Sequence, residues 1–272
     1  MALPPAAHSG CQKIGRPYTR KAWAPWSICS NLTSPCLVFS IGIGREWWFD
    51  EFMADRGCEV HSFDPTIDLH DEHARVAHQL RNRGGGIHFH YVGLGAPSAT
   101  NYSGMYTQRK QSSLSEVAHL DVLLSRFAPG RRINVLKIDC EGCEWKEFAY
   151  LASRQPRLLE RVDELQLELH LTPSLHGLSG AAAARLVPRF FQHVMLEHGF
   201  RLHYALMPHF KPESEPVLPG EGVVPKELTA VAGTVATIGT SERPTLNRDA
   251  CCYGVVLRRV SAAAAVEAED LA

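Results

Sequence analysis

A short apolar segment, residues 36–41, runs into a turn with two glycines, Gly42 and Gly44, and then into an aromatic segment. A second apolar segment, residues 58–64, ends in the acid Asp64. Glycines after a first strand let the backbone approach a ligand closely, and an acid at the end of the next strand can bind ribose hydroxyls. The pattern predicts a strand–helix–strand unit that binds a nucleotide-type cofactor. An ordinary strand-to-helix turn is the alternative.

The residue at position 47 distinguishes between possible cofactors. A dinucleotide-binding turn has a third glycine, which lets the helix pack closely on the strand beside a pyrophosphate. This chain has Trp47 there. S-adenosyl-L-methionine carries no phosphate and needs only the close turn and the ribose acid, so Trp47 favours this methyl donor over NAD.

The composition limits the class of protein and its partners. A chain of 272 residues that is 45% hydrophobic and 21% charged suits one α/β domain with modest additions. The net charge is −1 and there is no long basic run, so nucleic acid is not indicated as a partner. No apolar run approaches the roughly 18 residues of a membrane span, and the first residues lack the features of a signal peptide.

The cysteines and two glycosylation motifs bear on the compartment. Cys36 and Cys58 begin the first two predicted strands, so they lie side by side if these strands are parallel neighbours in that register. Asn31 and Asn101 begin Asn-x-Ser/Thr motifs. Buried free thiols and chance motifs would suit a cytoplasmic protein, whereas disulfides and glycans would suit the secretory pathway or the extracellular space. These features leave the compartment undecided and slightly favour the secretory pathway or the extracellular space over the cytoplasm.

The order of predicted elements indicates the fold. Residues 1–34 form an N-terminal arm, and strands and helices then alternate through residues 35–259, which predicts a mostly parallel sheet covered on both faces. A Pro/Gly-rich insertion, residues 208–248, separates the last two strands, and residues 260–272 are a tail. Later strands are expected at residues 87–93, 133–139, 164–170, 200–207 and 251–258.

Helices are predicted from periodicity and capping signals. The second helix covers residues 70–83, and a capping box formed by Ser113 and Glu116 predicts the start of the next one. Further helices are expected at residues 144–151 and 182–198.

Polar side chains gather at the carboxyl ends of the predicted strands, where ligands bind in open α/β sheets. The group comprises Asp139, Glu141, Glu144, Glu168 and His170. An acid at the end of an apolar strand is costly to bury unless it binds something. Capping of the helix that follows is the alternative explanation for Asp139, Glu141 and Glu144.

Four segments in order carry a family resemblance: residues 39–44, 57–65, 135–145 and 167–170. Together they resemble the FkbM-like and methyltransferase-like (METTL-type) S-adenosylmethionine-dependent methyltransferases, over roughly residues 11–258. The resemblance implies a class I Rossmann-like sandwich with a seven-stranded, mostly parallel sheet. It also implies S-adenosyl-L-methionine as the cofactor and methyl transfer, typically to oxygen.

The resemblance also implies roles for single residues. Gly42 and Gly44 would let the backbone meet the methionine part of the cofactor, and Asp64 would bind the ribose hydroxyls. The residues expected to flank the adenine are Phe63, Pro65 and Leu94. These assignments predict O-methylation of a small-molecule or glycan-like acceptor.

Asp139 and His170 are the predicted catalytic residues. An alcohol acceptor must lose its proton, and His170, with a reference pKa of about 6.5, is the best-placed general base by residue type. A strand-end histidine that bonds to backbone is the alternative. The residues left without an assigned role near the substrate are Glu141, Glu144, Trp145 and Glu168.

Several alternatives remain. Cys140 and Cys143 lack the second pair that a zinc site needs, and no metal is predicted, although a divalent ion held by Asp139, Glu141 and Glu168 is conceivable. Ser40 stands where many class I methyltransferases have an acid, which keeps open a non-catalytic binding module. An NAD-type oxidoreductase or epimerase is less favoured because of Trp47.

Overall fold

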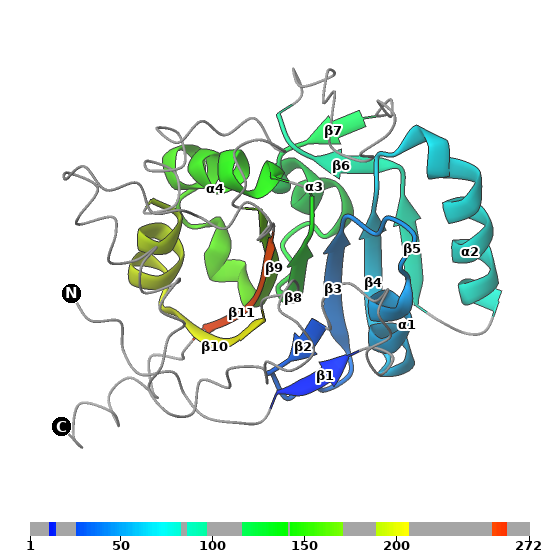
Figure 1. Cartoon of the computed structure of the whole chain (residues 1–272), viewed down its shortest axis with the longest axis horizontal. Helices are drawn as coiled ribbons and strands as arrows, with labels where there is room; N and C mark the ends of the chain where they lie inside the picture. Colours follow the sequence, from blue (N-terminus) through cyan, green and yellow to red (C-terminus); the bar gives the residue numbers. More distant parts are fainter. Residues whose placement is uncertain are drawn as a thin grey trace.

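A seven-stranded sheet in the order β10-β11-β9-β8-β3-β4-β5 forms the centre of the molecule (Figure 1). The computed structural model describes residues 11–14, 26–82, 86–96, 116–140, 142–170, 189–206 and 252–259. The strands of the sheet are β3 (Cys36–Ile41), β4 (Cys58–Phe63), β5 (Ile87–His90), β8 (Ile133–Ile138), β9 (Val162–His170), β10 (Phe200–Leu206) and β11 (Cys252–Arg259).

The described helices are α1 (Trp48–Asp55), α2 (His70–Asn82), α3 (Leu120–Phe127) and α4 (Cys143–Arg154). Short helical segments are η1 (Ile67–Leu69), η2 (Leu158–Arg161) and the π-helix η3 (Gln192–Glu197). Two small two-stranded sheets are formed by β1 (Gln12–Ile14) with β2 (Trp26–Ile28), and by β6 (Val92–Leu94) with β7 (Glu116–Ala118). None of the helices in the described part of the chain is long and apolar enough to cross a membrane.

The strand directions confirm the predicted fold class. Strand β3 is parallel to β4 and β8, β4 is parallel to β5, and β8 is parallel to β9. Strand β11 is antiparallel to both β9 and β10, so the last two strands form an antiparallel pair at one edge. This is the α/β, Rossmann-like sandwich expected of a class I methyltransferase. Cys36 pairs with Cys58 in the register between β3 and β4, as predicted.

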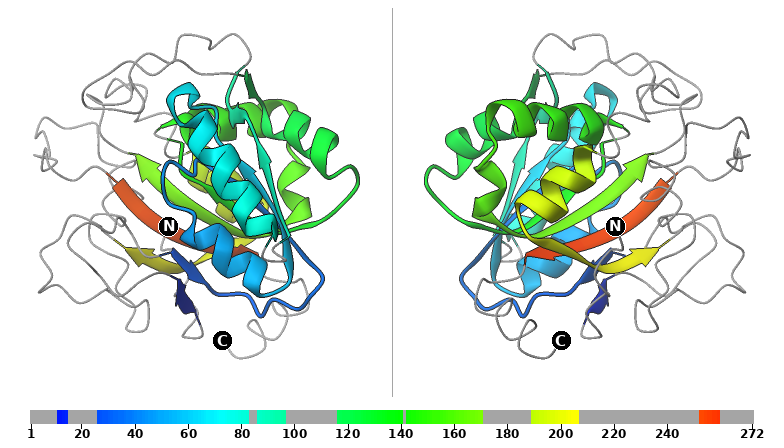
Figure 2. Two further views of the ribbon diagram at one scale, coloured as in Figure 1. Left: turned by 90° about the vertical axis from the view of Figure 1, so that its right-hand side faces the viewer. Right: turned by 90° about the vertical axis from the view of Figure 1, so that its left-hand side faces the viewer.

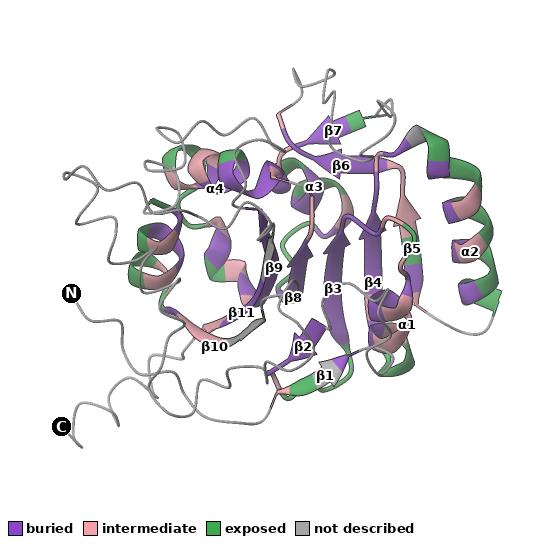
Figure 3. Ribbon diagram, viewed as in Figure 1, coloured by how far each residue is buried: buried purple, intermediate pink, exposed green. Residues whose placement is uncertain are grey.

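The core has two parts, one on each face of the sheet. Helices lie on both faces of the sheet (Figure 2), and its central strands are buried (Figure 3). Side chains alternate between faces along a strand, so Val38 packs with residues of α1 and α2, whereas Phe39 packs with residues of α3 and α4. The central strands are buried on both faces, which explains why their sequences are nearly continuous apolar runs.

The predicted strand 87–93 and the helix predicted to start near Ser113 are corrected by the structure. Strand β5 ends at His90, and β6 pairs with β7 in a separate sheet. Glu116 lies in β7 rather than in the first turn of a helix, and α3 begins at Leu120. The capping role falls to the Glu147 carboxylate, which accepts a hydrogen bond from the Leu120 backbone N–H at 2.8 Å.

The boundaries predicted for the arm, insertion and tail stay predictions. Residues 208–248 and 260–272 lie outside the described residues, as does most of the segment 1–34. The helix predicted at 182–198 is described only from residue 189 onward, where η3 is its main element.

Candidate functional site

The glycine turn after β3 contacts the end of β8. Gly42 has a φ of +76°, a conformation that side chains rarely adopt, and its N–H donates to the Phe63 carbonyl at 2.9 Å. A Cβ added at Gly42 would lie 1.6 Å from the backbone oxygen of Asp139. Only glycine fits there, and this close approach places the predicted cofactor turn directly beside Asp139.

Asp64 holds this turn in place. One carboxylate oxygen accepts hydrogen bonds from the N–H groups of Ile43 at 3.1 Å and Gly44 at 2.8 Å, and the other accepts from Thr66 at 2.9 Å. A carboxylate can accept about four hydrogen bonds, so these three leave room for one more. The structure thus shows a supporting role for Asp64 that the sequence analysis did not identify, and its bond to ribose stays a prediction.

A buried polar cluster lies next to the glycine turn, between the sheet and α1. The hydroxyl groups of Ser40 and Ser62 both donate to the carboxylate of Asp50, which reaches the sheet from α1. Lys137 on β8 is also buried, and its ammonium group donates to the Gly42 carbonyl at 2.7 Å. Burial raises the pKa of Asp50 to about 6, an increase that the nearby Lys137 charge partly opposes.

This cluster changes the interpretation of Ser40. Its hydroxyl is fully buried and donates a hydrogen bond to Asp50 at 3.1 Å. An acid is therefore present next to the glycine turn, but it is Asp50 of α1 rather than the residue at position 40. The sequence analysis missed both Asp50 and Lys137. The only available signal was that Ser40 and Ser62 occupy paired positions on adjacent strands.

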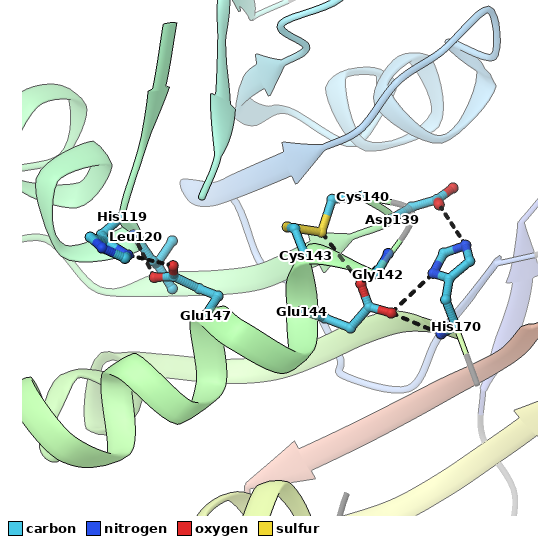
Figure 4. Close-up of a disulfide and its surroundings, with 9 residues drawn as sticks. All are labelled: His119, Leu120, Asp139, Cys140, Gly142, Cys143, Glu144, Glu147 and His170. Carbon is cyan, nitrogen blue, oxygen red and sulfur yellow. Dashed lines mark hydrogen bonds and ion pairs between the residues drawn. A yellow bond between two sulfur atoms is a disulfide. The ribbon is translucent and has the colours of Figure 1, made fainter. Parts of the chain in front are cut away.

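Asp139, Glu144 and His170 come together from the end of β8, the first turn of α4 and the end of β9 (Figure 4). The Glu144 Oε1 atom lies 3.0 Å from His170 Nδ1 and 2.8 Å from the His170 backbone N. The His170 Nε2 atom lies 4.0 Å from Asp139 Oδ1. Glu144 and His170 are buried, whereas Asp139 is partly exposed. The structure therefore brings both predicted catalytic residues into one group.

The other predicted residues near the substrate have different positions. Trp145 is buried, and its Nε1 donates to the His170 carbonyl at 2.7 Å, so it fixes the end of β9. Glu168 lies two residues before His170 and is buried. Glu141 lies outside the described residues.

The residues predicted to flank an adenine lie partly in the core. The ring of Phe63 is fully buried, and its centre lies 5.0 Å from that of Phe39 and 5.4 Å from that of Phe127. Leu94 is also buried in this part of the core. Pro65 lies beside Gly93, where an added Cβ would come within 2.5 Å of the Pro65 ring. An adenine contact in this region stays a prediction.

Three disulfides join six cysteines of the described residues: Cys11–Cys29, Cys36–Cys58 and Cys140–Cys143. The last lies at the start of α4, and Cys140 Sγ is 3.4 Å from Glu144 Oε2 (Figure 4). Sulfur atoms that are bonded to each other do not offer thiolate ligands to zinc. The Cys140–Cys143 pair thus contributes to the surroundings of Glu144.

A family model described as "Methyltransferase domain" matches residues 9–204. "Probable methyltransferase-like protein 24" from Homo sapiens is 29% identical over 202 residues, which cover 70% of this chain and 50% of the relative. The protein of the same name from Rattus norvegicus is 28% identical over 205 residues, covering 71% of this chain and 51% of the relative. The chain thus spans about half the length of these curated relatives.

Solved structures with a related arrangement were also found. The M. capricolum TrmK complex with S-adenosyl-homocysteine has 6% identity and a TM-score of 0.41, covering 84% of this chain and 64% of that chain. The N-terminal domain of EvdMO1, in the presence of S-adenosyl-homocysteine and D-fucose, has 12% identity and a TM-score of 0.35, with coverages of 84% and 77%.

Proposed function

Because this chain belongs to the Methyltransferase domain family, we propose that it transfers a methyl group from S-adenosyl-L-methionine to an oxygen of a small-molecule or glycan-like acceptor. Membership confirms the prediction of a methyltransferase domain and of S-adenosyl-L-methionine as its cofactor. The similarity to methyltransferase-like protein 24 agrees with the METTL-type resemblance. The FkbM-like part of that resemblance stays a prediction.

The contact between Gly42 and Asp139 carries this proposal. The space that a Cβ would fill at Gly42 is taken by the Asp139 backbone, so the glycine turn and the end of β8 share one edge of the sheet. Asp64 fixes the same turn through Ile43 and Gly44. The residues predicted to contact the methionine and ribose parts of the cofactor therefore lie beside the Asp139–His170 group.

The chemistry of methyl transfer explains why the Asp139–His170 group would lie beside the cofactor. When bound, S-adenosyl-L-methionine supplies an electrophilic methyl group on a positively charged sulfur. Methyl transfer is an in-line displacement, so correct positioning of the acceptor oxygen supplies much of the rate enhancement. An alcohol must also lose its proton to become a good nucleophile. We assign the activation of this hydroxyl to the partly exposed Asp139 and the buried His170, whose side chains lie 4.0 Å apart at the carboxyl ends of β8 and β9.

The proposal is tested by product analysis. The purified protein is incubated with isotopically labelled S-adenosyl-L-methionine and with panels of glycans, polyols, lipids and small alcohols, and the products are analysed by mass spectrometry. We expect an increase by one labelled methyl group on an oxygen. Asp139→Asn should abolish most of this signal, whereas Asp55→Asn, at an exposed position of α1, should leave it intact. Labelling only on nitrogen, or binding of the cofactor without transfer to any acceptor, would refute O-methylation.

We also propose that the protein works in an oxidising compartment of the secretory pathway or outside the cell. Disulfides persist there and are reduced in the cytosol, so three disulfides among the described cysteines support this proposal. Asn31 is exposed, as a glycosylated residue must be. Thiol counting on protein alkylated at lysis from its native source is the test. Eight free thiols and an unmodified Asn31 would place the protein in the cytosol instead.

A further inference from the structure

A cavity of about 440 Å³ lies between strands β1 and β2, the end of α1, and strands β10 and β11. Its walls include the Cys11–Cys29 disulfide, Arg56 just after α1, His203 on β10 and Arg258 on β11. Small-molecule sites are usually clefts of roughly 300 to 1,000 Å³. The cavity therefore has room for a ligand larger than a bare ion.

The cavity lies far from the proposed methyl-transfer site. Arg258 is paired with Glu164 near the start of β9, and His170 is the last residue of that strand. A strand rises about 3.3 Å per residue, so the segment from Glu164 to His170 spans roughly 20 Å. In Figure 1, β1 and β2 lie at the opposite end of the sheet from the arrowheads of β3, β4 and β8. A ligand in this cavity would therefore occupy a second site.

The charged side chains in the walls are basic. None of the described residues that line the cavity is an aspartate or a glutamate. Arg258 donates to the Cys29 carbonyl at 3.1 Å. Arg56 donates to the Gln12 side chain, and its guanidinium lies 3.6 Å from the centre of the Phe52 ring. A guanidinium has five N–H donors, so both arginines are held by neutral partners and keep donors for a further acceptor.

The acid paired with Arg258 in the strand register does not line the cavity. Glu164 is fully buried, and its carboxylate accepts the Cys29 backbone N–H at 3.2 Å and the Gln166 side-chain N–H at 2.7 Å. Burial raises the pKa of Glu164, because its charged form is poorly solvated there. Glu164 thus holds the end of β2 on the sheet and does not supply a carboxylate to the cavity.

The half-buried His203 lies in the field of two arginines. Burial lowers its pKa, and the positive charges of Arg258 and Arg201 lower it further. Both charges therefore act on the same part of the cavity wall. An anion bound beside these groups would offset the repulsion between them.

The other walls offer both polar and apolar contacts. Hydrogen-bonding side chains come from Gln12, Ser30 and Asn31, and apolar surface comes from Ile28 and Leu32. A sugar ring presents hydroxyl groups at its edge and C–H groups on its faces, so it can use both kinds of contact. An inorganic ion would use only the polar ones.

We propose that this cavity is a second ligand site, which binds an acidic saccharide through charge-assisted bonds from Arg56 and Arg258 to its carboxylate, sulfate or phosphate group. Arginine matches such oxyanions because its planar fork donates two parallel N–H bonds. The site is separate from methyl transfer, and its ligand need not be the methyl acceptor.

Binding is measured by calorimetry on the full chain, produced in an oxidising bacterial strain so that the disulfides form and Asn31 carries no glycan. The probes are glucuronate, a sulfated glucose and a phosphorylated glucose, with glucose as the neutral control and inorganic sulfate and phosphate as the ions alone. We expect an acidic sugar to bind at least about 10-fold more tightly than glucose, the change expected for one hydrogen bond to a charged group. Glucose that binds equally well, or an inorganic ion that binds as tightly as the acidic sugars, would overturn the proposal.

Two arginine variants test the residues. Arg56→Gln and Arg258→Gln should each weaken binding of the acidic sugar by about 10-fold or more. Arg75→Gln, at an exposed position of α2 outside the cavity, should leave the affinity unchanged. If Arg258→Gln fails to fold, the exposed Arg56 still decides the question, because Arg56→Glu should abolish binding. Wild-type affinity in both Arg56 variants would refute the site.

Amide NMR spectra locate the ligand. We expect the acidic sugar to shift the signals of Gln12, Cys29 and Arg258 and to leave those of Gly42 and Gly44 in place. Shifts confined to the glycine turn would refute the second site and leave the proposed function intact. Because no step here depends on S-adenosyl-L-methionine, binding in the cavity by a protein that transfers no methyl group would refute the proposed function alone.

Discussion

Glu144 binds His170 twice, through the backbone N–H at 2.8 Å and through the imidazole Nδ1 at 3.0 Å. A single carboxylate on α4 thus fixes both the end of β9 and the direction of its last side chain. Trp145, the next residue on α4, donates to the carbonyl of the same histidine at 2.7 Å. The position of His170 therefore depends on the first turn of this helix.

The first prediction concerns this pair. Glu144→Gln replaces one acceptor oxygen by an amide donor, so it cannot accept from both His170 groups and from Gly142. We expect turnover to fall by about 10- to 100-fold because His170 is no longer held in place, with the affinity for S-adenosyl-L-methionine nearly unchanged. Glu197→Gln is the control, because it removes a similar contact of 2.9 Å to His193. Wild-type turnover in Glu144→Gln would show that the contact is only structural.

The second prediction concerns the close approach at Gly42. Gly42→Ala adds the strain of a positive φ and a clash with the Asp139 backbone, and we expect a loss of about 2–5 kcal/mol in the free energy of unfolding. Gly130→Ala is a matched control, since Gly130 has a φ of +70° but nothing within 4 Å of an added Cβ. It should lose only about 1–2 kcal/mol. Urea unfolding measures both, and equal losses would contradict the clash.

The third prediction concerns Asp64. Asp64→Ala removes the acceptor that holds Ile43 and Gly44 and is predicted to bind the ribose. Hydrogen bonds to a charged group contribute about 1.5–3 kcal/mol each, so the affinity for S-adenosyl-L-methionine should fall by roughly 10- to 100-fold or more. Calorimetry compares this variant with Asp55→Ala, at an exposed position. An unchanged affinity in Asp64→Ala would remove Asp64 from the cofactor site.

The arrangement of β3 and β4 was predictable from the sequence alone. Apolar runs followed by a glycine turn and an acid define two parallel strands, and the same spacing joins Cys36 to Cys58 and Ser40 to Ser62. The rule that ligands bind at the carboxyl ends of strands likewise brought Asp139 and His170 together before their distance was known.

Contacts that depend on tertiary packing were not predictable. Helix α3 starts later than its capping signal suggested because Glu116 is in a strand and Glu147, far along the chain, caps the helix. Asp50 looked like an ordinary helix residue, yet it is the acid behind the glycine turn. Phe63 precedes Asp64 in the sequence, and its ring packs in the core, a burial that the motif alone did not indicate.

The last prediction concerns the pH dependence of stability. Burial raises the pKa of Asp50 from 3.8 to about 6, so the folded state holds this proton more tightly than the unfolded state does. The free energy of unfolding should therefore fall as pH rises from about 4 to about 6, by up to about 3 kcal/mol from this group, and then stay level. Asp50→Asn cannot ionise and should lack this contribution.

Urea unfolding of wild-type protein and Asp50→Asn at pH 4, 5, 6 and 7 isolates the effect, because the other titrating groups are common to both proteins and largely cancel in the difference. The variant also loses an acceptor for Ser40 or Ser62, which adds a constant offset rather than a slope. Asp55→Asn, at an exposed site, should run parallel to the wild type across the series. A difference between wild type and Asp50→Asn that does not change with pH would mean that Asp50 is ionised throughout. Its charge would then be balanced by Lys137 and the two serines.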